Sequence, residues 1–126
     1  MKPLWIVTWT GGLLAGELPQ AREFPTRNRA KQWARMAGVG KAAKLHRIVC
    51  YDNGGRSADR FTVVYLDAPE RSPKTYLCLG MNHEPFHPMG IGQHGSAMVG
   101  RHLGRRIPFA NLPDDCRKAV LQDLAS

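Results

Sequence analysis

Three histidines, His83, His87 and His94, form the group of residues whose chemistry is easiest to name. Their spacing is His-x3-His-x6-His, and imidazole is a common ligand of zinc and other late transition metals. With water as a fourth ligand they would make a hydrolytic zinc centre. However, His-x3-His binds one metal most readily on a helix, and Pro85 and Pro88 interrupt that geometry. Zinc binding here is one hypothesis. The alternative is that the histidines satisfy backbone groups of a loop.

The same histidines belong to a long segment, about residues 80–106, that shows no helix or strand pattern and is expected to be a functional Gly/His-rich loop. Its glycines at 90–95 spell GxGxxG, but the strand and helix that a dinucleotide fingerprint requires do not flank them. They predict instead a backbone nest that holds an anion. Phe86 and Met89 are expected to fasten the loop to the core. Three cations follow the glycines: Arg101, Arg105 and Arg106.

A second basic region precedes this segment. Between residues 27 and 47 there are seven Lys or Arg residues and no acidic residue. Three of them recur at every fourth position and so share one face of a predicted helix: Arg27, Lys31 and Arg35. Lys41, Lys44 and Arg47 would extend this face. Positive charge gathered on one face is typical of a surface that contacts phosphates, and the alternative is a solvated face that keeps the protein soluble.

The composition of the chain agrees with a polyanionic partner. Eighteen Lys and Arg residues against ten Asp and Glu give 126 residues a formal net charge of +8, which favours nucleic acid or an acidic protein surface. The length predicts one domain. Three cysteines without a Cys-x-x-Cys pair indicate a reducing, cytoplasmic compartment. No apolar stretch approaches the roughly 20 residues that cross a bilayer, so no membrane partner is expected.

Apolar alternation predicts the elements that must position these residues. Thr26 is a predicted helix N-cap, Gly38 a helix stop, and Pro113 the start of a final helix. The segment 60–66 is apolar on both faces, which predicts a central strand. The strands are expected at residues 4–9, 45–51, 60–66 and 75–79, with a short edge strand at 107–109. The expected fold is a single α+β domain, a mostly antiparallel sheet of four to five strands with two helices packed on one face.

Three stretches carry a family resemblance: CYDNGGRSADRFTVVY, GMNHEPFHPMGIGQHG and HLGRRIPFANLPDDC. Together they resemble a family of small hypothetical proteins from phages and other mobile elements of proteobacteria. The resemblance covers the chain from Cys50 to the C-terminus. It implies a bacterial cytoplasmic setting and an accessory role in the contest between such an element and its host. It implies no activity, cofactor or site residue.

The sequence therefore predicts a small basic accessory protein that binds nucleic acid through phosphates with little sequence selectivity. No nucleophile stands beside a histidine, so no catalytic residue is assigned and the protein is expected to be non-enzymatic. Two alternatives stay open. One is a protein-interaction module that inhibits a host nucleic-acid-directed complex, and the other is a metal-dependent hydrolase. The oligomeric state is left open. The expected nucleic-acid-binding residues are Arg27, Lys31, Arg35, Lys41, Lys44, Arg101, Arg105 and Arg106.

Overall fold

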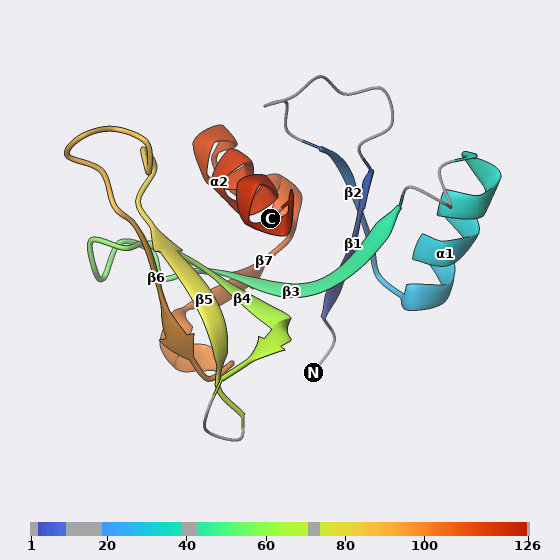
Figure 1. Cartoon of the computed structure of the whole chain (residues 1–126). Helices are drawn as coiled ribbons and strands as arrows, with labels where there is room; N and C mark the ends of the chain where they lie inside the picture. Colours follow the sequence, from blue (N-terminus) through green and yellow to red (C-terminus); the bar gives the residue numbers. More distant parts are fainter. Residues whose placement is uncertain (1–2, 10–18, 39–42, 71–73, 126) are drawn as a thin grey trace.

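The computed structural model describes residues 3–9, 19–38, 43–70 and 74–125 (Figure 1). It is an α+β domain with two α-helices, two short 3-10 helices and one antiparallel sheet. The elements in chain order are β1 (Leu4–Trp9), β2 (Gln20–Phe24), α1 (Arg27–Met36), β3 (Lys44–Asp52), β4 (Phe61–Pro69), β5 (Tyr76–Met81), β6 (Gly92–Ala97), η1 (Arg101–Leu103), β7 (Arg105–Ile107), η2 (Phe109–Asn111) and α2 (Asp114–Ala125). No helix among the described residues is long and apolar enough to span a bilayer.

The sheet is organised around β3. Its strand order is β2-β1-β3-β4-β5-β6, and β7 also pairs with β3. Ile48 pairs with Leu4 of β1 and with Tyr65 of β4, so these two strands lie on opposite edges of β3. Tyr51 pairs with Arg106 of β7, on the same edge of β3 as β1 but beyond the residues that pair with β1. The long strand β3 therefore holds β1 at its beginning and β7 at its end.

Strand β4 is the central strand that its sequence predicts. Its first six residues, 61–66, are all buried. Val63 and Tyr65 face the core beneath α2, while Val64 and Leu66 belong to a second cluster on the other face. Apolar side chains on both faces are what a strand covered from both sides requires.

The two helices pack on opposite faces of the sheet, so the prediction that both cover one face is wrong. Cys116 and Val120 of α2 share a core with Ile6 of β1. Ala30 of α1 packs instead against Val7, the next residue of the same strand. Successive side chains of a strand point to opposite faces. Figure 1 shows α2 over the curved middle of the sheet and α1 beside β1.

The sheet also has seven strands, where four to five were expected. The two strands that were not predicted, β2 and β6, have sequences that carry almost no apolar alternation, QAREF and GQHGSA. Both form by backbone pairing with a neighbouring strand. Strand β2 pairs with β1, and β6 pairs with β5. The prediction that residues 80–106 form one structureless loop is therefore wrong. It contains β6, η1 and the start of β7.

Candidate nucleic-acid interface

Helix α1 presents a basic helix face, defined here as Arg27, Lys31 and Arg35. The hydroxyl oxygen of Thr26 accepts a hydrogen bond from the Arg29 amide at 3.2 Å, which caps the helix as predicted. The small side chains of α1 are buried against the sheet, and all three cations are exposed. Since α1 contains no acidic residue, the positive charge of this face is not neutralised from within the helix.

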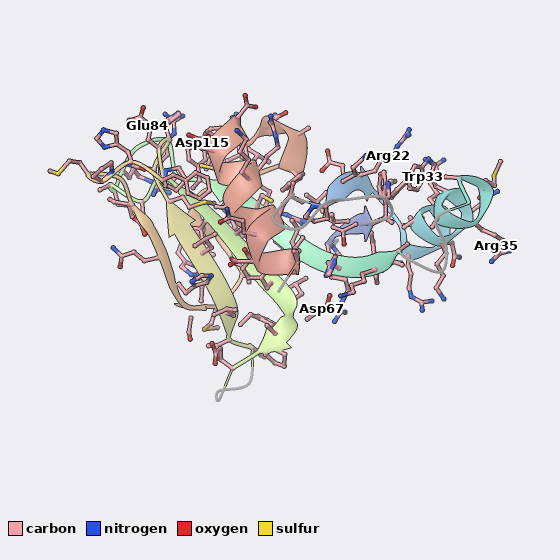
Figure 2. The ribbon with its side chains drawn as sticks, turned by 45° about the horizontal axis from the view of Figure 1, so that its top comes forward. Arg22, Trp33, Arg35, Asp67, Glu84 and Asp115 are labelled. Carbon is pink, nitrogen blue, oxygen red and sulfur yellow. The ribbon has the colours of Figure 1, made fainter. Side chains whose placement is uncertain are left out.

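Aromatic rings pack around Trp33, which lies on the side of α1 away from Lys31. The guanidinium of Arg22, in β2, lies 5.3 Å from the ring centre of Trp33 and 5.8 Å from that of Phe24. Trp33 in turn contacts Trp9, with ring centres 4.9 Å apart. These three rings are only partly buried. Figure 2 shows Arg22, Trp33 and Arg35 at the α1 end of the molecule, far from Glu84 and Asp115. The sequence did not point to Arg22, because it lies in a segment that reads as a loop.

The remaining residues predicted for this region differ in their position. Lys44 is exposed at the first position of β3, where it pairs with Thr8. Lys41 lies outside the described residues. Arg47, further along β3, forms an ion pair with Asp67 at 2.9 Å and lies over the ring of Trp5 at 5.9 Å. The Asp67 carboxylate offsets part of the charge of Arg47, so Arg47 adds to the charge of this face only in part.

The second predicted cluster gathers around one open cavity, which we call the arginine pocket. Its volume is about 620 Å³. Three segments line it: the end of β3, the chain from Val99 through η1, and β7. Its lining residues are Tyr51, Val99, Gly100, Arg101, Gly104, Arg105 and Arg106. The three arginines predicted as a cluster are thus brought together by folding.

The glycines that shape the arginine pocket are not those of the GxGxxG string. Gly92 and Gly95 lie in strand β6, so the predicted anion nest does not form there. Gly104 has φ +117°, and a Cβ atom on it would lie 2.4 Å from the carbonyl oxygen of Asp52. This close approach lets the turn after η1 fold onto β3. Glycine is needed at position 104 for both reasons.

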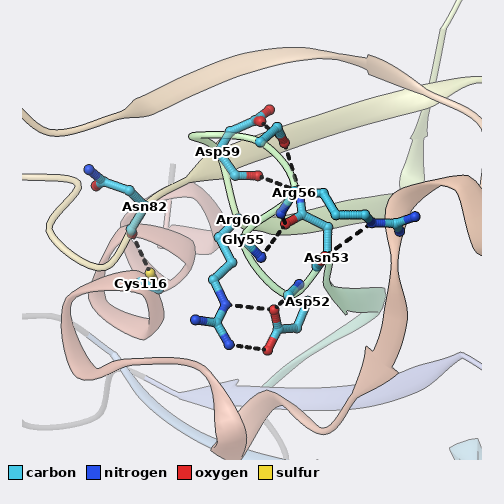
Figure 3. Close-up of polar contacts among 10 residues, drawn as sticks. Asp52, Asn53, Gly55, Arg56, Asp59, Arg60, Asn82 and Cys116 are labelled. Atoms are coloured by element: carbon cyan, nitrogen blue, oxygen red, sulfur yellow. Dashed lines mark hydrogen bonds and ion pairs between the residues drawn. The ribbon is translucent and has the colours of Figure 1, made fainter.

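The acid nearest to this pocket in the sheet register is Asp52, opposite Arg105. Its carboxylate is held by Arg60 through two hydrogen bonds of 2.8 and 3.1 Å and by the Gly54 amide at 2.8 Å (Figure 3). The hydrogen bond from Arg60 is the main cause that lowers the pKa of Asp52, and the charge of Arg105 contributes least. Asp52 therefore neutralises chiefly Arg60.

The basic helix face and the arginine pocket lie on the same face of β3. Leu45 packs in the cluster under α1, whereas Tyr51 lines the arginine pocket. An even number of positions separates them, so both side chains point to one side of the strand. This is the side opposite α2, because Ile48 and Cys50 belong to the α2 core. From Leu45 to Tyr51 the strand rises about 20 Å.

The three histidines proposed as zinc ligands make separate contacts. His83 lies edge-on to Phe61, with ring centres 4.9 Å apart. His87 accepts a hydrogen bond from the Met89 amide at its Nδ1 atom. His94 pairs through Nε2 with Asp123 at 2.9 Å. Within the described ranges, no three His, Cys, Asp or Glu residues are grouped to hold a metal ion. The zinc hypothesis thus gains no support from the geometry.

His94 belongs to a polar network that joins helix α2 to the sheet. The Asp123 carboxylate of α2 also accepts a hydrogen bond of 2.5 Å from the Tyr65 hydroxyl, through the same oxygen that binds His94. Burial is the first cause that raises the pKa of Tyr65 above its ordinary value, and the bond to Asp123 is the second. A neutral, donating tyrosine suits a structural link between β4 and α2.

The turn between β5 and β6 is ordered by its own hydrogen bonds. The side-chain oxygen of Asn82 accepts from the amides of Glu84 and Ile91, each at 3.1 Å. Phe86 and Met89 at its tip have exposed fractions of 49% and 84%. The expectation that they fasten this segment to the core is therefore wrong. The turn holds its shape while presenting two large apolar side chains to solvent.

The chain was also compared with known proteins. No family model, no curated protein and no solved structure matches it.

Proposed function

We propose that this protein is a non-enzymatic accessory protein of a mobile element that binds nucleic acid through phosphate contacts with little sequence selectivity. One observation carries the proposal: the basic helix face and the arginine pocket share one face of β3. A polyanion lying along that face would meet both clusters at once. The overall charge of +8 would add long-range attraction.

The strand positions beneath the two clusters, Leu45 and Tyr51, are about 20 Å apart along β3. This rise corresponds to roughly six base pairs of duplex, at about 3.4 Å for each pair. A duplex of about twelve base pairs is about twice as long and leaves room to contact cations on both sides of that span. The partly exposed rings near Arg22 also offer stacking surfaces to unpaired bases. These contacts carry little sequence information, which supports low selectivity.

Fluorescence anisotropy with labelled DNA and RNA of about twelve nucleotides or base pairs tests this proposal. The titrations run from low to physiological salt, with two unrelated base sequences for each type of nucleic acid. We expect micromolar or tighter binding at low salt, a logarithm of affinity that falls steeply with the logarithm of salt, and similar affinities for both sequences. Absence of binding at low salt would reject the proposal.

A second candidate is the protein-interaction module, and the exposed tip of the β5–β6 turn favours it. An ordered turn that presents Phe86 and Met89 can dock into an apolar pocket without losing much conformational entropy. This candidate predicts a complex with a host protein that survives nuclease treatment. The complex should be lost when Phe86 and Met89 are both changed to serine, whereas nucleic-acid binding should persist in that variant.

A further inference from the structure

We propose that the arginine pocket binds one nucleotide with its phosphate, held by Arg101 and Arg106, the β7 arginine that pairs with Tyr51 in the sheet, and seated against an apolar wall. The inference rests on the proposed function and deepens it, because it names the unit that this end of the surface recognises. That unit is a nucleoside monophosphate, which could be a free nucleotide or the terminal nucleotide of a chain with a 5′-phosphate.

The charge of the pocket suits a phosphate monoester. Three arginines line it, and guanidinium groups bind phosphate oxygens with paired, charge-assisted hydrogen bonds. Arg101 forms no ion pair within the described part of the chain. The carboxylate opposite Arg105, that of Asp52, is already bound by Arg60. A doubly charged terminal phosphate would supply the missing negative charge better than a phosphodiester, which has a single charge.

The size and the apolar wall of the pocket point to more than a phosphate. Its volume of about 620 Å³ falls within the roughly 300–1,000 Å³ typical of small-molecule sites. Val99, which is partly exposed, and Tyr51, which is 3% exposed, line it, and both belong to the apolar cluster on this face of the sheet. Val99 therefore offers a ligand more uncovered apolar surface than Tyr51 does. An inorganic phosphate would leave this wall uncovered. A sugar and base attached to the phosphate would cover it.

The pocket is also held in shape before any ligand arrives. The Gly100 amide donates a hydrogen bond of 3.2 Å to the Tyr51 hydroxyl. Leu103 and Val99 pack against the same cluster as Tyr51, and Gly104 brings the chain back against Asp52. A preformed site loses little conformational entropy on binding. The preformed pocket thus favours binding of one nucleotide at a defined site over non-specific association of anions.

Isothermal titration calorimetry with AMP, adenosine and inorganic phosphate tests the inference on the wild-type protein. We expect AMP to bind at least about tenfold more tightly than either adenosine or phosphate, since each of these lacks one half of the interactions. Equal affinity for AMP and adenosine would overturn the assignment of a phosphate site. Equal affinity for AMP and inorganic phosphate would overturn the assignment of a nucleotide.

Two double variants with the same loss of charge separate the pocket from general electrostatic attraction. Arg101→Gln with Arg106→Gln should weaken AMP binding by about tenfold or more. Lys31→Gln with Arg35→Gln, on the basic helix face, should leave AMP binding within about twofold of wild type. Equal losses in both variants would overturn the inference. Circular dichroism checks that both double variants are folded. If the pocket variant is not folded, the titrations of the wild-type protein with AMP, adenosine and phosphate still decide the question.

Oligonucleotides distinguish the two sources of the nucleotide and the two proposals. Single strands of about eight nucleotides with a 5′-phosphate should bind more tightly than the same strands with a 5′-hydroxyl, if a chain end is the ligand. Equal binding of both strands, with tight AMP binding, assigns a free nucleotide. If oligonucleotides bind but AMP at about 1 mM does not, the inference fails and the proposed function stands. If AMP binds and oligonucleotides do not, the inference stands and the proposed function fails.

Discussion

The hydroxyl of Tyr51 accepts a hydrogen bond from the backbone amide of Gly100 at 3.2 Å. Tyr51 lies near the end of β3 with an exposed fraction of 3%, and Gly100 directly precedes η1. The bond therefore fixes the segment that carries Arg101 to the strand that also supports α1. Removal of this bond should loosen the arginine pocket without disturbing the cores under either α-helix.

Tyr51→Phe tests that relationship. The substitution removes the hydroxyl and keeps the ring, so the free energy of unfolding should fall by about 0.5–1.5 kcal/mol. Gly100 is partly exposed, and water can replace the missing acceptor, which favours the lower end of this range. Urea unfolding followed by tryptophan fluorescence measures the change. A variant as stable as wild type would show that the bond does not hold the segment in place.

Gly104→Ala should be strongly destabilising. A residue with φ +117° at this position is tolerated almost only as glycine, and the new Cβ atom would also meet the backbone of Asp52. We expect the free energy of unfolding to fall by about 1–3 kcal/mol. Gly95→Ala is the matched control, because a Cβ atom there meets only the Cys78 sulfur at 3.8 Å. Comparable melting temperatures for the two variants would refute this account of the turn.

Asp52 should make stability depend on pH in the acid range. Its pKa is lower in the folded chain than its ordinary value of 3.8. Its contribution is therefore fully present above that value, and it is lost as the pH falls through the folded pKa. Asp52→Asn should be less stable than wild type at pH 7, and the two should converge as the pH drops below about 4. Melting curves at a series of pH values measure this. A constant difference between them down to about pH 2 would contradict it.

The three cysteines should be unreactive in the folded protein. Cys50, Cys78 and Cys116 are free and buried. Burial raises the pKa of Cys116 to about 11 and moves those of the other two above their ordinary value as well. Thiolates are the reactive form, so a thiol reagent at pH 8 should modify the native chain slowly and all three cysteines after unfolding in urea. Rapid modification of one thiol in the native protein would show that its core opens.

The parts of the fold that follow local rules could be predicted from the sequence. Strand β1 and helix α1 have the expected positions, because an aromatic, β-branched run and a Thr26 cap are signals contained in a few residues. Strand β6 could not be predicted, since GQHGSA has neither alternation nor strong β propensity. It forms by pairing with β5, an interaction between backbones that local sequence patterns do not encode.

The candidate site shows the same division. The spacing of four residues between Arg27, Lys31 and Arg35 predicts that they share one exposed helix face. The structure shows all three cations exposed. The closeness of the later arginines in sequence predicts a cluster, and they line one pocket. Which face of the sheet each cluster occupies depends on the pairing of β7 with β3 and on where the helices pack. Those are long-range interactions. For that reason the prediction that both helices cover the same face of the sheet was wrong.

The most direct test compares the salt dependence of DNA binding in two double variants with equal charge loss. Lys31→Gln with Arg35→Gln removes two cations from the basic helix face, while Lys74→Gln with Lys118→Gln removes two exposed lysines that belong to neither cluster. With a duplex of about twelve base pairs, the first variant should bind more weakly. The slope of log affinity against log salt should become shallower by about 1.8, at roughly 0.9 for each phosphate that the variant no longer neutralises. The second variant should keep the wild-type slope. Equal changes in both would show that net charge, and not this face, attracts the nucleic acid.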